Sequence, residues 1–307
     1  MSAARDPLRS PGAGRRPPWA EFRAALDAVG FRPTKGLGQN FLVDPNAARS
    51  IALDSGVGAG DRVLEIGAGC GFLTVHLAEL GVELLAVEID TRLIEVAARF
   101  LSGYSLVRLL RRDVLSGKHG LDPEVLAALP AEGPWDVVSN LPYSISGPAL
   151  ALLGRLVNPP RSMTVLVQEE VAERVAAAPG SSAWGALPAR LGALYRARLG
   201  RRIGEQLFWP RPRVASRVVQ LHLQPLEGLR PSEELPAYDS LVDLLFTQRR
   251  KQLLGVLASA LGDRDRAARM VSEAGLDPRI RPEELHPEVL LRLSRSPGWG
   301  GSLSARA

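Results

Sequence analysis

Residues 62–73, RVLEIGAGCGFL, are the part of the sequence that decides the fold. The run from Arg62 to Ile66 has the composition of a buried strand, and Leu73 to Leu80 continues with the apolar spacing of a helix. The glycines between them, in the order G-x-G-x-G, allow a tight turn and let a ligand approach the backbone and the first N–H groups of the helix. A tight connection without a ligand would also need glycines. The stretch therefore predicts an α/β domain and leaves the ligand to the residues around it.

The pattern on either side of this turn alternates between strands and helices. Such alternation predicts a mostly parallel sheet covered by helices on both faces, a doubly wound α/β domain. Two late strands are expected as an antiparallel pair at one edge of this sheet. The strands are expected at Leu84 to Glu88, Leu106 to Leu110, Asp136 to Ser139, Met163 to Gln168, Tyr195 to Ile203 and Val214 to Leu223. The helices are expected at Trp19 to Val29, from Pro45 with Asp44 as N-cap, and at Thr91 to Leu101, Pro148 to Val157 and Glu169 to Ala177.

The chain changes character after Pro225. Four segments there have helical spacing, separated by short breaks that contain Gly or Pro. We therefore expect a disordered basic tail at 1–18, the α/β domain at 19–225 and a small all-helical domain at 226–307 with a flexible end. The four helical segments are Glu234 to Thr247, Lys251 to Leu261, Arg264 to Ala274 and Glu283 to Leu293.

Composition limits the classes of function. The 307 residues are 46% hydrophobic, enough for a sizeable core, and they contain no run of membrane-spanning length and no apolar secretory signal, so a cytoplasmic protein is expected. A single cysteine and four scattered histidines give no metal-binding pattern, so no metal is expected. The formal charge of +5, with arginines bunched along the chain, favours an anionic partner such as nucleic acid.

Three carboxylates stand at or beside the ends of predicted strands. Glu88 ends the strand after the turn, about 20 residues on, where a carboxylate accepts both hydroxyls of a ribose. Glu65 precedes the turn, and Asp113 follows the third strand, where it could accept from an adenine amine. The turn lacks the third glycine of the dinucleotide fingerprint, and an acid before the turn is more usual in S-adenosylmethionine (SAM) methyltransferases. SAM is the predicted cofactor; an NAD-dependent oxidoreductase is a disfavoured alternative that a cofactor-binding measurement would test.

The fourth predicted strand ends in the tetrad Asn140, Leu141, Pro142 and Tyr143. In an open α/β sheet this end of a strand faces the ligand. The amine of an aromatic base is a poor nucleophile, because its lone pair is delocalised into the ring. The Asn140 side-chain oxygen and a backbone carbonyl such as that of Leu141 could accept its two N–H bonds and aim the lone pair at a methyl group. Pro142 would orient the carbonyl and Tyr143 would stack on a base that has left its helix.

Because of these motifs and their order, the sequence resembles the ribosomal RNA adenine dimethyltransferase family, and most of all its small-subunit (KsgA/RsmA-type) branch. The resemblance spans roughly residues 35 to 251 and keeps the family's order. Departures such as Ala68, Cys70, Trp209 and Arg211 remove no hydrogen-bonding or stacking group of the motifs. The matching stretches are 35–42 (KGLGQNFL), 65–71 (EIGAGCG), 140–146 (NLPYSIS), 208–216 (FWPRPRVAS) and 246–251 (FTQRRK).

The resemblance implies a Rossmann-like SAM-dependent methyltransferase domain and a role for each matching residue. Phe208 would be the second aromatic, sandwiching the flipped adenine against Tyr143. The implied reaction converts two adjacent adenines near the 3′ end of 16S rRNA to N6,N6-dimethyladenines, in the small ribosomal subunit, by a monomeric enzyme. The implied cofactor-binding residues are Gln39, Asn40, Leu42, Glu65, Gly67, Glu88, Asp113 and Asn140. Arginine clusters around Arg111, Arg201, Arg213 and Arg249 are expected to contact phosphates, with Arg213, Arg249, Arg250 and Lys251 as the RNA-binding residues.

Two alternatives share much of this pattern. The sister branch methylates a 23S rRNA adenine and gives macrolide resistance; the 246–251 stretch, the NLPYSIS wording and the helical tail favour the small-subunit branch. A non-catalytic rRNA-binding assembly factor could keep the fold, but it would have lost the groups that bind the amine. Asn140, Tyr143 and Phe208 are all present.

Overall fold

The computed structural model describes residues 17–34, 36, 38–117 and 120–299, so residues 1–16 of the predicted tail lie outside it. The chain divides into two compact units. The first contains Met1–Ala172 and Arg198–His222, and the second contains Glu173–Ala197 and Leu223–Ala307. The longer segment of the second unit begins at Leu223, near the predicted boundary at 225, and the unit also takes in 173–197, a segment expected in the α/β domain.

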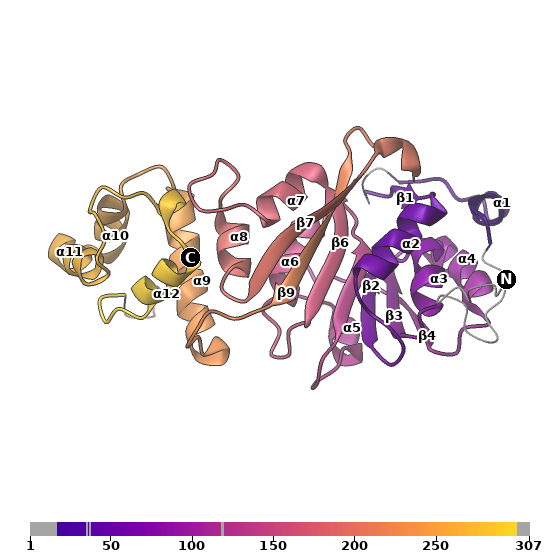
Figure 1. Ribbon diagram of the computed structural model, residues 1–307, viewed down its shortest axis with the longest axis horizontal. Coiled ribbons are helices and arrows are strands. Elements are labelled where there is room, and N and C mark those ends of the chain that lie inside the picture. The colour runs from indigo at the N-terminus through magenta and orange to yellow at the C-terminus, as the bar shows by residue number, and fades with distance from the viewer. Residues whose placement is uncertain (1–16, 35, 37, 118–119, 300–307) are drawn as a thin grey trace, which may run out of the picture. The chain divides into compact units, whose positions relative to one another are not determined.

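A seven-stranded sheet forms the centre of the first unit, in the order β4-β3-β2-β5-β6-β9-β7 (Figure 1). The five strands from β4 to β6 are parallel, and β9 pairs antiparallel with β6. This is the predicted mostly parallel sheet with two late strands at one edge. The strands are β2 (Arg62–Ile66), β3 (Glu83–Glu88), β4 (Val107–Arg111), β5 (Asp136–Asn140), β6 (Ser162–Gln168), β7 (Tyr195–Ile203) and β9 (Ser216–Leu223).

The central strands are buried and mostly apolar, although β2 includes the buried Glu65 and β6 the buried Thr164. All residues of β6 but the last are buried, as are all of β2 but the first. Parallel strands covered on both faces have this composition. Helices flank the sheet, and α2, α3 and α4 lie side by side along it (Figure 1). Those of this part of the chain are α1 (Trp19–Ala28), α2 (Pro45–Asp54), α3 (Phe72–Ala78), α4 (Thr91–Leu101), α5 (Pro123–Ala128), α6 (Ser146–Leu153) and α7 (Glu169–Val175).

Strands β2 and β5 are neighbours although two strands separate them in the chain. From β2 the chain proceeds to β3 and β4 on one side and then crosses to β5 and β6 on the other. In open α/β sheets a ligand binds outside the carboxyl ends of the strands at such a change of direction. The Ser139 hydroxyl ties the two strands together by donating to the carbonyl of Ile66 at 2.6 Å. The turn after β2 and the tetrad at the end of β5 therefore stand side by side.

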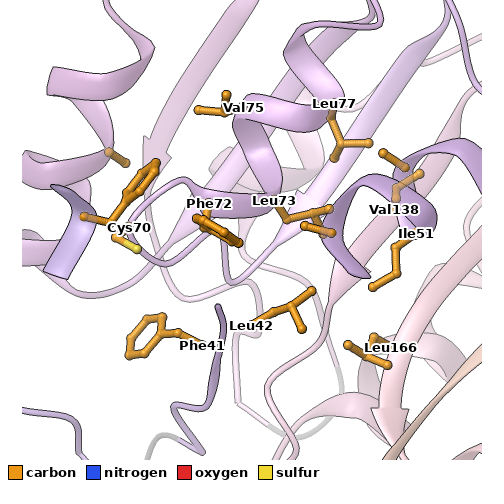
Figure 2. Packing of buried hydrophobic residues seen from close by; sticks show 14 of the residues in the cluster. Phe41, Leu42, Ile51, Cys70, Phe72, Leu73, Val75, Leu77, Val138 and Leu166 are labelled. Atoms are coloured by element: carbon orange, nitrogen blue, oxygen red, sulfur yellow. The ribbon is translucent and has the colours of Figure 1, made fainter. Parts of the chain in front are cut away.

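A second, two-stranded sheet had no counterpart in the sequence analysis. Strand β1 (Phe41–Leu42) pairs antiparallel with β8 (Phe208–Trp209), so that Phe41 faces Trp209 and Leu42 faces Phe208. The Val43 N–H continues the ladder by donating to the carbonyl of Leu207 at 2.9 Å. Phe41 and Leu42 face the segment that carries Cys70, Phe72 and Leu73 (Figure 2). Two stretches that are distant in the sequence are thus joined into one ribbon above the turn.

The second unit is helical. Tyr238 is fully buried and donates its hydroxyl to the carbonyl of Ala189 at 2.7 Å, and the Trp184 and Phe246 rings meet edge to face at 6.4 Å. These contacts explain why 173–197 groups with the C-terminal helices. None of the described helices is long and apolar enough to span a membrane. The helices of this unit are α8 (Ala186–Leu191), α9 (Pro231–Thr247), α10 (Leu253–Leu261), α11 (Arg264–Glu273) and α12 (Pro287–Ser294).

Candidate cofactor and target-base site

The turn after β2 depends on two glycines. Gly67 and Gly69 have φ values of 72° and 59°, in the left-handed region where a side chain is strained. A Cβ atom on Gly67 would stand 2.8 Å from Cγ of Pro142, and one on Gly69 would stand 3.0 Å from Cε1 of Phe41. The bare backbone therefore lets the tetrad loop on one side and β1 on the other approach the turn closely.

Glu88, at the end of β3, is almost completely bonded within the fold. Its Oε2 accepts the Gly69 N–H at 2.8 Å, and its Oε1 accepts the N–H groups of Ile89 and Asp90 at 2.9 and 3.0 Å. Burial raises the pKa of this carboxyl, and the three backbone donors oppose that shift. The result is a carboxylate held at one position beside the glycine turn.

Glu65, at the other side of the turn, is buried but incompletely bonded. Its side chain is 1% exposed, and its Oε2 has no hydrogen-bond partner among the described residues. Burial raises the pKa of Glu65 to about 8, and the charge of Glu88 adds to the shift. An ammonium group placed next to this oxygen would relieve the cost of burying the charge.

Cys70 belongs to the same turn and is not poised for nucleophilic attack. It is buried, and burial raises the pKa of its thiol to about 12. No group of three or more His, Cys, Asp and Glu side chains in the described part of the chain is arranged to hold a metal ion.

Asn140 ends β5 and presents an unused acceptor. Its Nδ2 donates to the carbonyl of Asn40 at 3.1 Å, which fixes the orientation of the amide. Its Oδ1 is buried and has no partner among the described residues. An unpaired buried oxygen costs about 1–3 kcal/mol, so an N–H donor supplied by a ligand is strongly favoured there. The Pro142 carbonyl already accepts the Ile145 N–H at 3.1 Å. The Leu141 carbonyl is therefore the candidate for a second acceptor beside the Asn140 oxygen.

The segment before β1 closes over the tetrad. A Cβ on Gly38, whose φ is 64°, would stand 3.2 Å from the backbone nitrogen of Tyr143. Gln39 accepts the Thr34 N–H through Oε1 at 2.8 Å, while its Nε2 is buried without a partner. Lys35 and Leu37 of the same motif lie outside the described residues.

These elements surround one cleft of about 1000 Å³, its open mouth included. The cleft brings together eleven of the predicted cofactor and catalytic residues, and Asp113 stands on it as an exposed carboxylate. The cleft is also lined by residues that were not predicted as site residues. Among them, Phe41 lies inside one of the matching motifs, whereas Ile89 and Arg112 are marked in the sequence only by following a strand. The predicted residues on the cleft are Gln39, Asn40, Leu42, Glu65, Gly67, Glu88, Asp113, Asn140, Leu141, Pro142 and Tyr143.

The structure does not bring the two predicted stacking aromatics together. Tyr143 lines the cleft, and its hydroxyl shares a 2.6 Å hydrogen bond with that of Ser216. Phe208 is only 4% exposed and packs into the hydrophobic core, opposite Leu42 in the ribbon. A sandwich of Tyr143, adenine and Phe208 would therefore require Phe208 to leave its present position.

The predicted RNA-binding residues differ in how they are bonded. Arg213 in the first unit, and Arg250 and Lys251 in the second, are exposed, and their side chains have no hydrogen bond or ion pair within the described ranges. Arg249 donates to the carbonyls of Trp184 and Ser182 at 2.6 and 3.3 Å and so holds its own unit together.

Arg201 belongs to one of the arginine clusters expected to contact phosphates, but it is already bonded: its guanidinium donates two hydrogen bonds to Asp54, at 2.7 and 3.1 Å. The arginines of these clusters are therefore not equally available to RNA.

The residues on the cleft fit SAM. The Glu88 carboxylate stands beside the glycine turn, as expected of an acceptor for ribose hydroxyls, and a Cβ at Gly67 or Gly69 would crowd the turn. Glu65 and Asn140 each keep a buried oxygen without a partner, available to an ammonium group or an amine. These acceptors thus match a nucleoside with a charged amino-acid tail next to an amine substrate.

Comparison with known proteins agrees with this chemistry. A model of the family "Ribosomal RNA adenine dimethylase" matches residues 30–295. The Ribosomal RNA small subunit methyltransferase A of Leifsonia xyli is 39% identical over 277 residues, covering 90% of this chain and 96% of its own. The proteins of the same name from Nocardia farcinica and Shouchella clausii are each 38% identical, covering 90% of this chain and 93% of their own.

Solved structures with the same fold include two enzymes. A dimethyladenosine transferase from Plasmodium falciparum superposes with a TM-score of 0.67 at 21% identity, over 81% of this chain and 94% of its own. The 23S rRNA methyltransferase ErmE superposes with a TM-score of 0.63 at 26% identity, over 83% of this chain and 98% of its own. With the family model spanning most of the sequence and relatives near 38% identity covering nine-tenths of it, the chain belongs to the ribosomal RNA adenine dimethylase family.

Proposed function

We propose that this chain converts two adjacent adenines near the 3′ end of 16S rRNA to N6,N6-dimethyladenines in the small ribosomal subunit. By family the chain is a SAM-dependent rRNA adenine dimethyltransferase. The proposal concerns the rRNA and the residues that act on it. The observation that carries it is the buried Oδ1 of Asn140, an acceptor without a partner in the wall of the cleft.

In the proposed reaction the protein makes the adenine amine nucleophilic by holding it. Asn140 Oδ1 accepts one N–H of the amine and the Leu141 carbonyl accepts the other. The lone pair is then no longer delocalised into the ring and points across the cleft. The bond from Asn140 Nδ2 to the Asn40 carbonyl keeps the oxygen facing the amine. When bound, SAM supplies an electrophilic methyl group; no covalent enzyme intermediate is required.

The remaining site residues take positioning roles in this proposal. Pro142 fixes the loop that bears the carbonyl, and Tyr143 offers its ring to the flipped adenine. Phe208 covers the other face of the base after leaving the core. Glu88 accepts from the ribose of SAM and Asp113 from its adenine. The residues proposed at the methionine end are Gln39, Asn40, Leu42, Glu65 and Gly67.

The choice of the small subunit over the large one rests on similarity. The relatives that are 38 to 39% identical are named for the small subunit, whereas the 23S rRNA methyltransferase ErmE is 26% identical. The assembly-factor alternative lacks support, because the amine-binding groups are present and Asn140 Oδ1 is left open. An assembly role could accompany catalysis but would not account for this oxygen.

The proposed RNA contacts are electrostatic. Among the predicted RNA-binding residues, Arg213, Arg250 and Lys251 have side chains available to phosphates, and Arg249 acts mainly by anchoring its unit. A small-subunit substrate places the chain in the cytoplasm, where we expect it to act as a monomer.

The proposal can be tested by tritium transfer from labelled SAM to undermethylated small subunits and, in parallel, to large subunits. We expect label in N6,N6-dimethyladenine of the small subunit, and its loss in Asn140→Ala. Nuclease digestion and chromatography would identify the modified base and its position.

The other outcomes would overturn the proposal in different ways. Label confined to the large subunit would move the chain to the 23S branch. Tight binding to small subunits without transfer of label would support the assembly factor instead.

A further inference from the structure

Trp209 stands outside the cleft, yet it is joined to the cofactor turn through one other ring. It faces Phe41 across the β1–β8 ribbon, and the two rings are stacked with centroids 5.8 Å apart and planes 25° apart. Phe41 in turn lines the cleft, and its ring edge lies 3.0 Å from where a Cβ of Gly69 would be. The Gly69 N–H donates to Glu88. A continuous packed path therefore runs from Trp209 to the proposed ribose carboxylate.

Trp209 is itself held from several sides. The Arg23 guanidinium carbon lies 3.9 Å from the centroid of its ring, and the rings of Trp19 and Phe31 lie at 6.0 and 6.5 Å. Phe31 also packs edge to face against Phe41 at 5.7 Å. Aromatic and cation–π contacts of this kind fix ring positions as well as adding stability. The cage leaves Phe41 little freedom to move away from the turn.

The ribbon also belongs to the part of the chain proposed to meet RNA. Phe208, the proposed second stacking aromatic, is the residue before Trp209 in β8 and packs on the opposite face of the ribbon, against Leu42. Arg213 follows four residues after Trp209. One short strand thus carries a residue for the base on one face and a ring that supports the cofactor turn on the other.

We propose that Trp209 is a positioning residue for SAM: it presses Phe41 against the Gly69 turn and so couples the target-base strand to the cofactor site. The inference rests on the proposed function only in taking the residues on the cleft as the SAM site. It predicts that SAM affinity depends on a side chain that does not line the cleft.

The test is SAM binding to the full-length protein by isothermal titration calorimetry, without RNA. Trp209→Ala removes the stacked ring. We expect about three- to tenfold weaker SAM binding, which corresponds to the usual interaction free energy of one aromatic pair. Trp209→Phe keeps a ring opposite Phe41 and should restore the affinity to within about twofold of the parent. Trp184→Ala, which removes a tryptophan from the second unit, should leave SAM affinity unchanged while lowering the melting temperature.

Steady-state kinetics with small subunits as the substrate distinguishes a positioning role of Trp209 from a loss of folded protein. A positioning role raises the KM for SAM of Trp209→Ala and leaves kcat at saturating SAM close to the parent value. Loss of folded protein would instead lower the apparent kcat without changing the affinity of the remaining fraction. If Trp209→Ala fails to fold, Trp209→Leu takes its place, because leucine fills part of the volume without offering an aromatic face.

Two results would overturn the inference. One is parental SAM affinity in a folded Trp209→Ala or Trp209→Leu variant, and the other is a Trp209→Phe variant as weak as alanine. Both are independent of the substrate proposal, since failure of that proposal would appear as normal SAM binding without label in the small subunit.

Discussion

The two walls of the cleft differ in how far their polar groups are bonded within the fold. On the wall formed by residues 67–71 and Glu88, here the cofactor wall, both carboxylate oxygens of Glu88 accept backbone N–H groups. On the wall formed by residues 140–143, here the amine wall, the Asn140 oxygen has no partner among the described residues. In the proposed site, the bonded Glu88 carboxylate offers its remaining lone pairs from a fixed position, whereas the Asn140 oxygen is open to an N–H group of a bound molecule.

Glu65 is the exception on the cofactor side. It is as deeply buried as Glu88, but its Oε2 is as open as the oxygen of Asn140. Bonding within the fold, rather than position on one wall, thus separates the proposed roles: Glu88 is a fixed acceptor, whereas Glu65 and Asn140 are proposed to accept N–H groups of bound molecules.

The largest effect is expected from Asn140→Ala. Removing a preorganised acceptor of this kind lowers kcat by about 100- to 1000-fold. The SAM dissociation constant should change by less than about tenfold, because one hydrogen bond at most is lost there. Single-turnover tritium transfer and calorimetry measure the two quantities.

Asn158→Ala is the matched control for the loss of an amide. Its Nδ2 is bonded to the carbonyls of Pro130 and Gly133, both at 3.0 Å, and it does not line the cleft. This variant should lose stability and keep its rate. Equal rate losses in the two variants would contradict the distinction between open and bonded groups.

The second effect is on stability and concerns Glu65→Gln. The pKa of Glu65 in the folded protein is about 8, against an ordinary value of 4.5. Between these pH values the folded protein holds a proton that the unfolded chain has released, so the free energy of unfolding falls as pH rises. Glutamine is neutral throughout, and at pH 8 the variant should therefore be more stable, by up to roughly a few kcal/mol.

Calorimetric melting of the ligand-free protein at about pH 5, 6.5 and 8 measures this slope. We expect a shallower slope in Glu65→Gln than in the parent, because the raised pKa of Glu88 still contributes in the variant. Glu173→Gln removes an exposed carboxylate from α7 and should follow the parent profile. Parallel curves for the parent and Glu65→Gln would mean that Glu65 is already ionised in the ligand-free protein.

The signals of the cofactor wall are local in the sequence. Short, mostly apolar stretches predicted the central strands, and the glycine spacing and the acid at the end of β3 predicted the turn. The ribbon of β1 and β8 escaped notice, since two-residue strands have no periodicity and their partners are more than 160 positions apart in the numbering. The family resemblance placed Phe208 on the base, but the burial that holds it in the core comes from tertiary packing.

The same limit applies to the basic residues. Arg201 and Arg250 look alike in the sequence, as members of arginine runs. Only the fold reveals that Arg201 is matched by Asp54, which lies 147 positions away, whereas Arg250 and its neighbour Lys251 have no ion-pair partner in the described part of the chain. Pairing between distant charges leaves no pattern in composition.

This contrast leads to the smallest of the expected effects, on RNA affinity. Arg250→Ala and Lys251→Ala should each weaken binding to small subunits severalfold and lower the salt slope of the affinity by about one phosphate contact. Arg201→Ala should leave the slope unchanged, because its guanidinium already neutralises Asp54 rather than a phosphate. Filter binding between about 50 and 200 mM salt measures these slopes. A slope lowered equally by all three substitutions would mean that Arg201 releases Asp54 for RNA, and bonding within the free protein would then no longer distinguish the cations that contact phosphate.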